Sequence, residues 1–107
     1  MANLNEIQTS VAQQIQMSEL LRQLTASQLL DFAVTGLNEE AGEVSGLCCR
    51  EIYKKKNISQ EWWTEELGDV LWYLAAAAWA KGLNLEDIWK YNEAKLIERY
   101  GEFRERG

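Results

Sequence analysis

Apolar side chains recur every three or four residues along most of the chain, the spacing that gathers them on one face of an α-helix. A helix N-terminus is often marked by a capping residue with Glu or Gln three residues later. The chain has two such pairs, Asn3 with Glu6 and Thr25 with Gln28. We therefore expect a first helix from residue 4 to the low twenties and a second over about 26–51.

The rest of the chain predicts two more helices. Residues 54–57 (Lys-Lys-Lys-Asn) interrupt the apolar pattern and are expected to form the main loop. Ser59 is suited to cap a third helix and Gly82 to end it, and Asn84 with Asp87 is suited to cap a fourth. The inner face of the third helix is expected to carry Trp63, Leu67, Val70, Leu71, Leu74 and Ala78. The inner face of the fourth is expected to carry Leu85, Ile88, Trp89, Leu96, Tyr100 and Phe103.

This pattern predicts an all-α protein. No segment alternates apolar and polar residues over the length of a strand, and proline is absent from the 107 residues. A chain of this length forms one domain, so residues 1–107 are expected to fold as a single four-helix bundle.

Two features predict an oligomer. Five tryptophans are more than a core of this size can hide. Four alanines at 75–78 would let another helix approach closely, either within the chain or from a second subunit. We therefore expect a homodimer or a homotetramer.

Composition excludes several classes of protein. The 17 acidic and 11 basic residues give a net charge of −6. This charge disfavours binding to nucleic acid or to an anionic membrane through a general basic surface. Histidine is absent, which excludes His-based catalytic triads, His-ligated zinc and the Glu-x-x-His motifs of di-iron bundles. Cys48 and Cys49 are adjacent, so we expect reduced thiols in the core or an interface of a cytoplasmic protein. We expect no signal peptide, and the most apolar stretch (70–80) is too short to span a bilayer.

The most informative feature is a pair of acidic clusters on the two central helices. The clusters are Glu40 with Glu43 on the second helix and Glu66 with Asp69 on the third. In each cluster the two acids are three residues apart, so they project from one helix face, beside the apolar residues. Carboxylates beside a buried apolar surface lower the stability of the fold unless a cation lies among them. Gly42 and Gly68 each cost up to about 1 kcal/mol of helix propensity and leave room for a ligand or for close helix contact.

Two antiparallel helices would bring the acidic clusters together as a site of four carboxylates. Oxygen ligands without imidazole or thiolate suit Mg²⁺, with Mn²⁺ as a substitute, better than zinc. The alternative is two solvated acidic faces. The repetition of the motif, its glycines and its apolar surroundings favour the metal site.

The residues around these acids resemble the signature of the MazG-like all-α nucleoside triphosphate pyrophosphatases. The matching blocks are Gly-Leu-Asn-Glu-Glu-Ala-Gly-Glu-Val at 36–44, Glu-Glu-Leu-Gly-Asp-Val-Leu-Trp-Tyr-Leu at 65–74 and Asn-x-x-Lys-Leu-x-x-Arg-Tyr at 92–100. The resemblance covers roughly residues 29–103. Either acidic block alone is a weak signal, whereas three blocks in this order are a specific one.

The resemblance implies a Mg²⁺-dependent enzyme that cleaves a ribo- or deoxyribonucleoside triphosphate between its α and β phosphates. The products are a nucleoside monophosphate and pyrophosphate, and the role is house-cleaning or control of nucleotide pools. The implied metal ligands are Glu40, Glu43, Glu66 and Asp69. Glu39 is our candidate for orienting the attacking water; otherwise it is a surface acid. Two alternatives are a relative that acts on phosphoribosyl-ATP and a non-catalytic helical interaction module with a structural metal site.

Basic and aromatic residues supply candidates for substrate binding. Asn92, Lys95 and Arg99 form a polar stripe on the fourth helix. If it faces the metal site, this stripe would hold the outer phosphates, with Arg99 making a bidentate contact; otherwise it is solvated. Tyr73 lies on the helix face that carries the acids and is a candidate for contact with sugar or base. Lys54 in the main loop is a weaker candidate that would close over the triphosphate.

Overall fold

The computed structural model describes residues 2–101. It contains α1 (Leu4–Met17), a 3₁₀ turn η1 (Leu21–Gln23), α2 (Ala26–Ile52), α3 (Gln60–Ala80) and α4 (Leu85–Tyr100). The described residues form no strand, so the all-α prediction is confirmed. None of the helices in this part of the chain is both long and apolar enough to cross a membrane.

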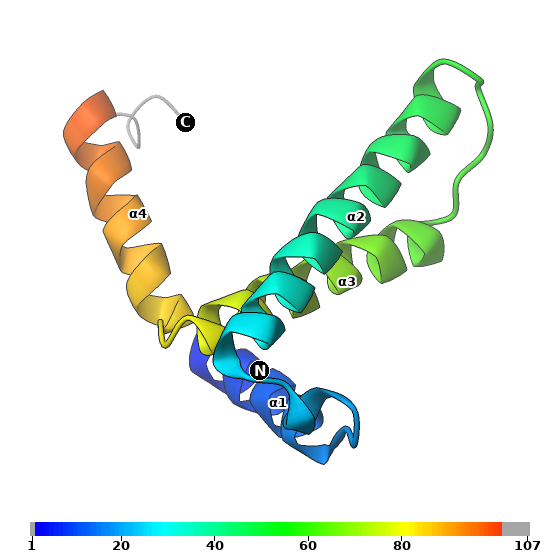
Figure 1. Ribbon diagram of the computed structural model, residues 1–107. Helices are drawn as coiled ribbons and strands as arrows, with labels where there is room; N and C mark the ends of the chain where they lie inside the picture. Colours follow the sequence, from blue (N-terminus) through cyan, green and yellow to red (C-terminus); the bar gives the residue numbers. More distant parts are fainter. Residues whose placement is uncertain (1, 102–107) are drawn as a thin grey trace.

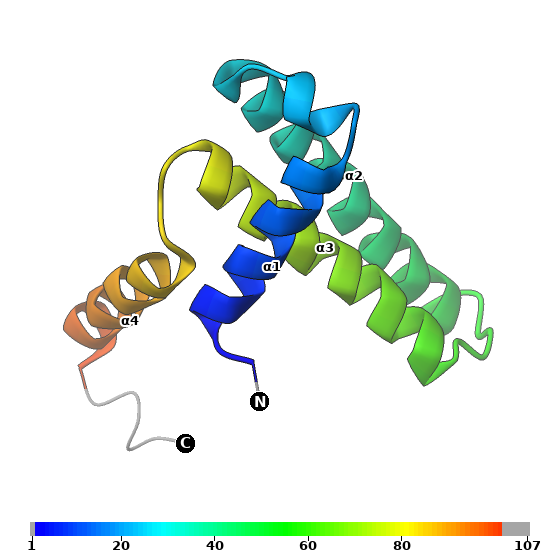
Figure 2. The same ribbon diagram turned by 90° about the horizontal axis from the view of Figure 1, so that it is seen from below.

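The helices are arranged as a V whose two arms meet at α1 (Figure 1). α2 and α3 form an antiparallel hairpin and share the most extensive contact in the molecule. α1 crosses α3, and α4 packs against α1 and extends away from the hairpin, as the view from below also shows (Figure 2). The predicted helical bundle is confirmed, but within one chain α4 is not closed against α2 and α3.

Side-chain caps fix the starts of the four α-helices where the sequence predicts them. Asn3 caps α1, Thr25 with Gln28 forms a complete capping box on α2, Ser59 caps α3 and Asn84 caps α4. Each cap oxygen accepts a backbone N–H that has no partner inside the helix, which stabilises the helix by about 1 kcal/mol. At the other end of α3, Gly82 has the predicted left-handed conformation (φ +74°) that stops the helix.

The first helix ends earlier than expected. It stops at Met17 because Ser18 adopts an extended backbone (φ −78°, ψ 121°), and the Ser18 hydroxyl accepts a hydrogen bond from Leu21 N at 3.2 Å. This cap starts the separate turn η1. The expected continuous helix into the low twenties is therefore wrong. A serine is neutral to unfavourable inside a helix, and here its hydroxyl caps a new turn instead.

The core lies where α1 crosses α3 beside the start of α2. Its buried members are Val11, Ile15, Leu29, Ala33, Ala75, Ala76, Ala78 and Leu85. Ala75 and Ala76 are completely buried, and their small side chains allow α1 to pack closely on α3. The four alanines therefore serve packing within the chain, and the alternative that they form a subunit surface is wrong for the three buried ones.

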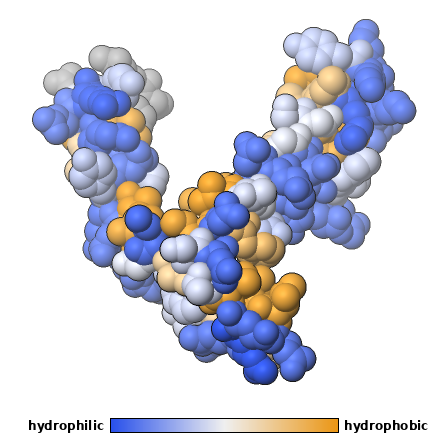
Figure 3. All heavy atoms as spheres, viewed as in Figure 1, coloured by the Kyte–Doolittle hydropathy of each residue, from blue (hydrophilic) through white to orange (hydrophobic). Residues whose placement is uncertain are grey.

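The inner face predicted for α3 is wrong for three of its leucines. Leu67, Leu71 and Leu74 are 52%, 40% and 41% exposed. The reason is geometric: α2 covers one side of α3 and α1 covers another, which leaves the leucines on a third side. Figure 3 shows apolar surface gathered around the junction of the two arms.

The fourth helix and the cysteines also depart from expectation. Leu85 is buried, but Ile88, Trp89 and Tyr100 are exposed, so most of the predicted inner face of α4 is uncovered in one chain. Phe103 lies outside the described residues.

Cys48 and Cys49 are exposed free thiols, so the expected position in the core is wrong and the position in an interface stays a prediction.

A buried amide fixes the turn between α3 and α4. Gln8 is only 8% exposed, and its Nε2 donates to Leu83 O at 2.7 Å while its Oε1 accepts from Leu85 N at 2.8 Å. Asn5 Nδ2 donates to Glu86 Oε2 at 2.6 Å one turn away on α1. These contacts attach the first turn of α4 to α1 and so set the direction in which α4 leaves the core.

Candidate functional site

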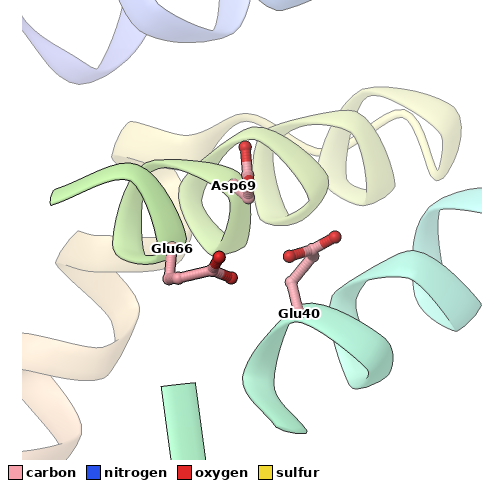
Figure 4. A group of neighbouring side chains, drawn as sticks. All are labelled: Glu40, Glu66 and Asp69. Atoms are coloured by element: carbon pink, nitrogen blue, oxygen red, sulfur yellow. The ribbon is translucent and has the colours of Figure 1, made fainter. Parts of the chain in front are cut away.

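The hairpin brings acids from both clusters together. Carboxylate oxygens of Glu40, Glu66 and Asp69 all lie within 4.8 Å of one another. Glu40 projects from α2 towards α3, and Glu66 reaches back from α3, with Asp69 one turn farther along (Figure 4). The spacing of three residues on one helix and the antiparallel packing of the two helices are enough to form this group.

Burial and mutual repulsion of the three carboxylates lower the stability of the folded chain on its own. Glu40 and Glu66 are half-buried, and Glu66 Oε2 is a buried oxygen without a hydrogen-bond partner among the described residues. Desolvation raises the pKa of the Glu40 carboxyl above its ordinary value of 4.5, and so do the charges of Asp69, Glu66, Glu39 and Glu43. Every group that shifts this pKa is an acid, so the cluster has a strong negative potential.

The other two acids lie at the edge of the group. Glu43 is exposed and is not among the three acids whose oxygens converge. Glu39 is also exposed, and its charge contributes to the raised pKa of both Glu40 and Tyr73. The structure therefore brings together three of the four predicted ligands and places Glu39 beside them.

The three converging acids fit a hard divalent cation. At a ligand distance of 2.0–2.1 Å, two oxygens bound to one Mg²⁺ stand at most about 4.2 Å apart, so oxygens that lie within 4.8 Å of one another need only small side-chain movements to share an ion. The Glu66 oxygen that lacks a hydrogen-bond partner has lone pairs to offer to a cation. The donors are all carboxylates, which suits Mg²⁺ or Mn²⁺. The described part of the chain thus has an acidic cluster able to bind a metal.

The raised pKa of Glu40 predicts how the metal-free protein responds to pH. The folded state holds this proton more tightly than the unfolded state, so the contribution of Glu40 to stability is greatest below pH 4.5 and is lost as pH rises through the folded pKa. We expect the free energy of unfolding in EDTA to fall over that range, and excess Mg²⁺ at neutral pH to restore it. Urea titrations from pH 4 to pH 7 check this, and a Mg²⁺-independent stability would contradict it.

Tyr73 lies directly beside the acids. Its ring packs against Phe32 and Trp72, with centroid distances of 5.7 and 5.1 Å. Desolvation and the charges of Glu40, Glu39 and Asp69 raise the pKa of the hydroxyl above 10.0. The hydroxyl therefore stays protonated at neutral pH and can donate a hydrogen bond towards the site.

Sequence reasoning missed the residue that makes room for this tyrosine. A Cβ at Gly36 would stand 2.6 Å from Tyr73 Cζ and closer still to two other ring carbons, so only glycine fits. A usable signal was present, because Gly36 lies four residues before Glu40 and so on the same helix face.

A groove of about 440 Å³ opens beside Tyr73 and Glu39. Its walls come from η1 and the adjoining segment, the first half of α2, and α3: Leu20, Leu21, Leu24, Gln28, Asp31, Phe32, Thr35, Gly36, Glu39 and Tyr73. The groove therefore combines apolar and aromatic surface with a few polar groups, and it adjoins the acidic cluster.

Comparison with known proteins agrees with this geometry. The model of the MazG nucleotide pyrophosphohydrolase domain matches residues 31–103. Searches of curated proteins and of solved structures give no significant match. The match covers most of the chain and contains both acidic clusters and the polar stripe of α4.

The chain belongs to the MazG family. The recognition made from the three sequence blocks is thereby confirmed. The family supports nucleotide pyrophosphohydrolase activity, which is a hydrolysis of an acid anhydride, and it is typically metal dependent.

The MazG domain carries its predicted phosphate-binding residues away from the acids. Asn92, Lys95 and Arg99 lie on α4, on the other arm of the V (Figure 1). Lys54 lies in the loop after α2, and the helix end at Ile52 is about 18 Å along the axis from Glu40. The only ion pairs within residues 2–101 are Arg22 with Glu19 and Lys90 with Glu86. None of the predicted basic residues contacts the acidic cluster within one chain.

The glycine within the first acidic cluster has open space around it. A Cβ at Gly42 would meet nothing within 4 Å, and the same holds at Gly68. Close helix contact inside the chain is therefore not the reason for either glycine. We expect Gly42→Ala to raise the free energy of unfolding by up to about 1 kcal/mol, the gain in helix propensity. Urea denaturation checks this, and a loss of stability would mean that the position is covered in solution.

Proposed function

We propose that this MazG protein is a Mg²⁺-dependent nucleoside triphosphate pyrophosphohydrolase. Its reaction would be hydrolysis of a (deoxy)nucleoside triphosphate between the α and β phosphates, giving a nucleoside monophosphate and pyrophosphate. The observation that carries the proposal is the group of three converging carboxylates, one of which, Glu66, has a buried oxygen without a hydrogen-bond partner. A house-cleaning or pool-controlling role in the cytoplasm follows from this activity.

The acidic residues have distinct tasks in this proposal. Glu40, Glu66 and Asp69 would hold the cation, and Glu43 would join them by a change of rotamer one turn along α2. A bound divalent cation would neutralise charge that develops on the phosphoryl oxygens. Glu39 is exposed beside the cluster and would orient the attacking water and accept its proton, since the chain has no histidine to do so.

The groove beside Tyr73 gives the nucleoside a place next to the acids. Its volume of about 440 Å³ lies within the range of small-molecule sites. Phe32 and Tyr73 offer aromatic surface for a base or sugar, and the protonated Tyr73 hydroxyl can donate to an oxygen of the substrate. This placement would leave the triphosphate running over the acidic cluster.

Pyrophosphate release tests the proposal. The protein is incubated with Mg²⁺ and a panel of ribo- and deoxyribonucleoside triphosphates together with phosphoribosyl-ATP. We expect pyrophosphate and the monophosphate from at least one nucleoside triphosphate, and no release in EDTA. Turnover of phosphoribosyl-ATP alone would identify the other enzyme class, and no turnover of any substrate would leave a non-catalytic helical module.

A further inference from the structure

The groove beside Tyr73 runs along α2 from the first turns of this helix to the acids. Four polar side chains line it in one row, because they are spaced by three, four and four residues: Gln28, Asp31, Thr35 and Glu39. At a rise of 1.5 Å per residue, Asp31 lies about 12 Å from Glu39 along the helix axis. The groove therefore extends from the acidic cluster to a second polar region at Gln28 and Asp31.

Between these two regions the groove offers apolar and aromatic surface. Phe32 and Tyr73 contribute rings whose centroids are 5.7 Å apart, and Leu20, Leu21 and Leu24 contribute aliphatic side chains. Leu20 is 72% exposed and Phe32 is 36% exposed, so this surface is open to a ligand. A planar ring that packs on aromatic and aliphatic side chains suits such a surface. The base of a nucleotide is a ring of this kind.

The polar region away from the acids presents one accepting group and one donating group. Asp31 is exposed and makes no ion pair within residues 2–101, so both of its carboxylate oxygens can accept from a ligand. The amide of Gln28 is oriented by the cap of α2, because its Oε1 accepts from Thr25 N at 3.0 Å. Its Nε2 is therefore the atom that can donate to a ligand.

Guanine is the base whose hydrogen-bonding edge matches both groups. Its N1–H and N2–H are adjacent donors that a carboxylate accepts as a bidentate pair, and O6 beside them is an acceptor. Adenine and cytosine offer one exocyclic donor next to a ring nitrogen that only accepts. Uracil and thymine have a carbonyl oxygen on each side of a single N–H. Each of these four bases would set an acceptor against the Asp31 carboxylate or leave one of its oxygens without a partner.

The length of the groove is also suitable for a nucleotide. The hydrogen-bonding edge of the base and the α phosphate lie at opposite ends of a nucleotide. The separation of about 12 Å between Asp31 and Glu39 leaves room for one nucleoside with a contact at each end. A base that pairs with Asp31 would thus have its α phosphate beside the acidic cluster.

We propose that this groove selects guanine nucleotides, with the Asp31 carboxylate accepting from N1–H and N2–H of the base and Gln28 Nε2 donating to O6. That the ligand is a nucleotide rests on the proposed function. Asp31 is a specificity-determining residue here and takes no part in bond cleavage. Recognition of the base is therefore measurable without turnover, and the two proposals can fail separately.

Isothermal titration calorimetry with nucleoside monophosphates and Mg²⁺ measures base recognition without hydrolysis. We expect GMP to bind at least about tenfold more tightly than the monophosphates of inosine, adenosine, cytidine and uridine, since each of them loses a hydrogen bond to a charged group. Inosine monophosphate is the sharpest comparison, because it differs from GMP only in lacking the N2 amino group. Equal affinities for these two nucleotides, or no binding of GMP at millimolar concentration, would overturn the inference.

Asp31→Asn should change which purine is preferred. The substitution replaces one accepting oxygen with an amide that donates. The affinity for GMP should fall at least about tenfold, to that of inosine monophosphate or below. The affinity for xanthosine monophosphate should rise, because a carbonyl oxygen replaces the N2 amino group in xanthine. A preference for GMP over inosine monophosphate that survives in Asp31→Asn would contradict the assignment.

Gln28→Glu tests the contact to O6 while preserving the helix cap. A glutamate oxygen can still accept from Thr25 N, and glutamate is favourable at this position of a capping box, so α2 should stay folded. The donor to O6 is lost. GMP and inosine monophosphate share this oxygen, so both should bind about tenfold more weakly. Unchanged affinities for both nucleotides would overturn the assignment of O6 to Gln28.

A matched control and a kinetic measurement complete the test. Asp87 is an exposed aspartate in the first turn of α4, outside the groove, so Asp87→Asn should leave the order of affinities unchanged. Equal kcat/KM for all nucleoside triphosphates would overturn guanine selection and still support the proposed function. Selective binding of GMP without hydrolysis of any triphosphate would overturn the proposed function and still support guanine selection.

Discussion

Asp69→Asn is expected to abolish turnover while the helical circular dichroism stays unchanged. The substitution keeps the size of the side chain but removes one of three charges that converge on the proposed cation. Loss of a charged ligand lowers the affinity for Mg²⁺, and without the cation the charge on the reacting phosphate is not neutralised. We expect a loss of at least about a hundredfold in kcat/KM, in line with the removal of a group that acts on the transition state.

The matched control for this variant is Glu65→Gln on the same helix. Glu65 is exposed and lies outside the converging acids, so the same change of charge should leave kcat/KM within about threefold of wild type. Metal-free Asp69→Asn should also be more stable than the metal-free wild type, because repulsion within the cluster is relieved. Full activity of Asp69→Asn at low Mg²⁺ would refute the assignment of the site.

Gly36→Ala is expected to destabilise the protein although alanine is the better helix former. The new Cβ would overlap the Tyr73 ring, which packs against Phe32 and Trp72 and would have to move out of these contacts. Overpacking of this kind costs about 1–3 kcal/mol, more than the gain of up to about 1 kcal/mol in helix propensity. Displacement of the ring should also lower kcat/KM, since the Tyr73 hydroxyl moves away from the acids.

The comparison for this variant is Gly46→Ala in the same helix. A Cβ at position 46 meets only the far end of Arg50 at 3.9 Å, so this substitution should be neutral or stabilising. Urea denaturation and steady-state kinetics measure both variants. Equal stability of Gly36→Ala and Gly46→Ala would mean that Tyr73 does not occupy the position described.

Local structure was predictable from the sequence because local chemistry determines it. Asn3, Thr25, Ser59 and Asn84 cap their helices as expected, since a short polar side chain satisfies orphan N–H groups wherever it precedes an apolar periodic segment. The acidic group was predictable for a similar reason. Residues three apart share a helix face, and a short loop makes the two helices antiparallel neighbours.

Tertiary placement was not predictable in the same way. An apolar stripe on α3 identifies a helix face that is expected to be buried. The spacing does not say whether the residues that pack against this face belong to the same chain. The pattern therefore predicts a core position for Leu67 and Leu71, whereas α1 and α2 cover the other sides of α3. The position of α4 depends on Gln8, whose two hydrogen bonds span more than seventy residues of sequence and leave no periodic signal.

The most direct test of the central claim is hydrolysis in ¹⁸O-labelled water, followed by mass spectrometry of the products. If Glu40, Glu66 and Asp69 position the α phosphate for attack, water adds at the α phosphorus and pyrophosphate leaves. The proposal predicts that the label appears in the nucleoside monophosphate and that the pyrophosphate carries none. Label in the pyrophosphate would show attack at the β phosphorus, and label in orthophosphate would show a phosphatase that acts from the γ end; either result would contradict the proposed reaction.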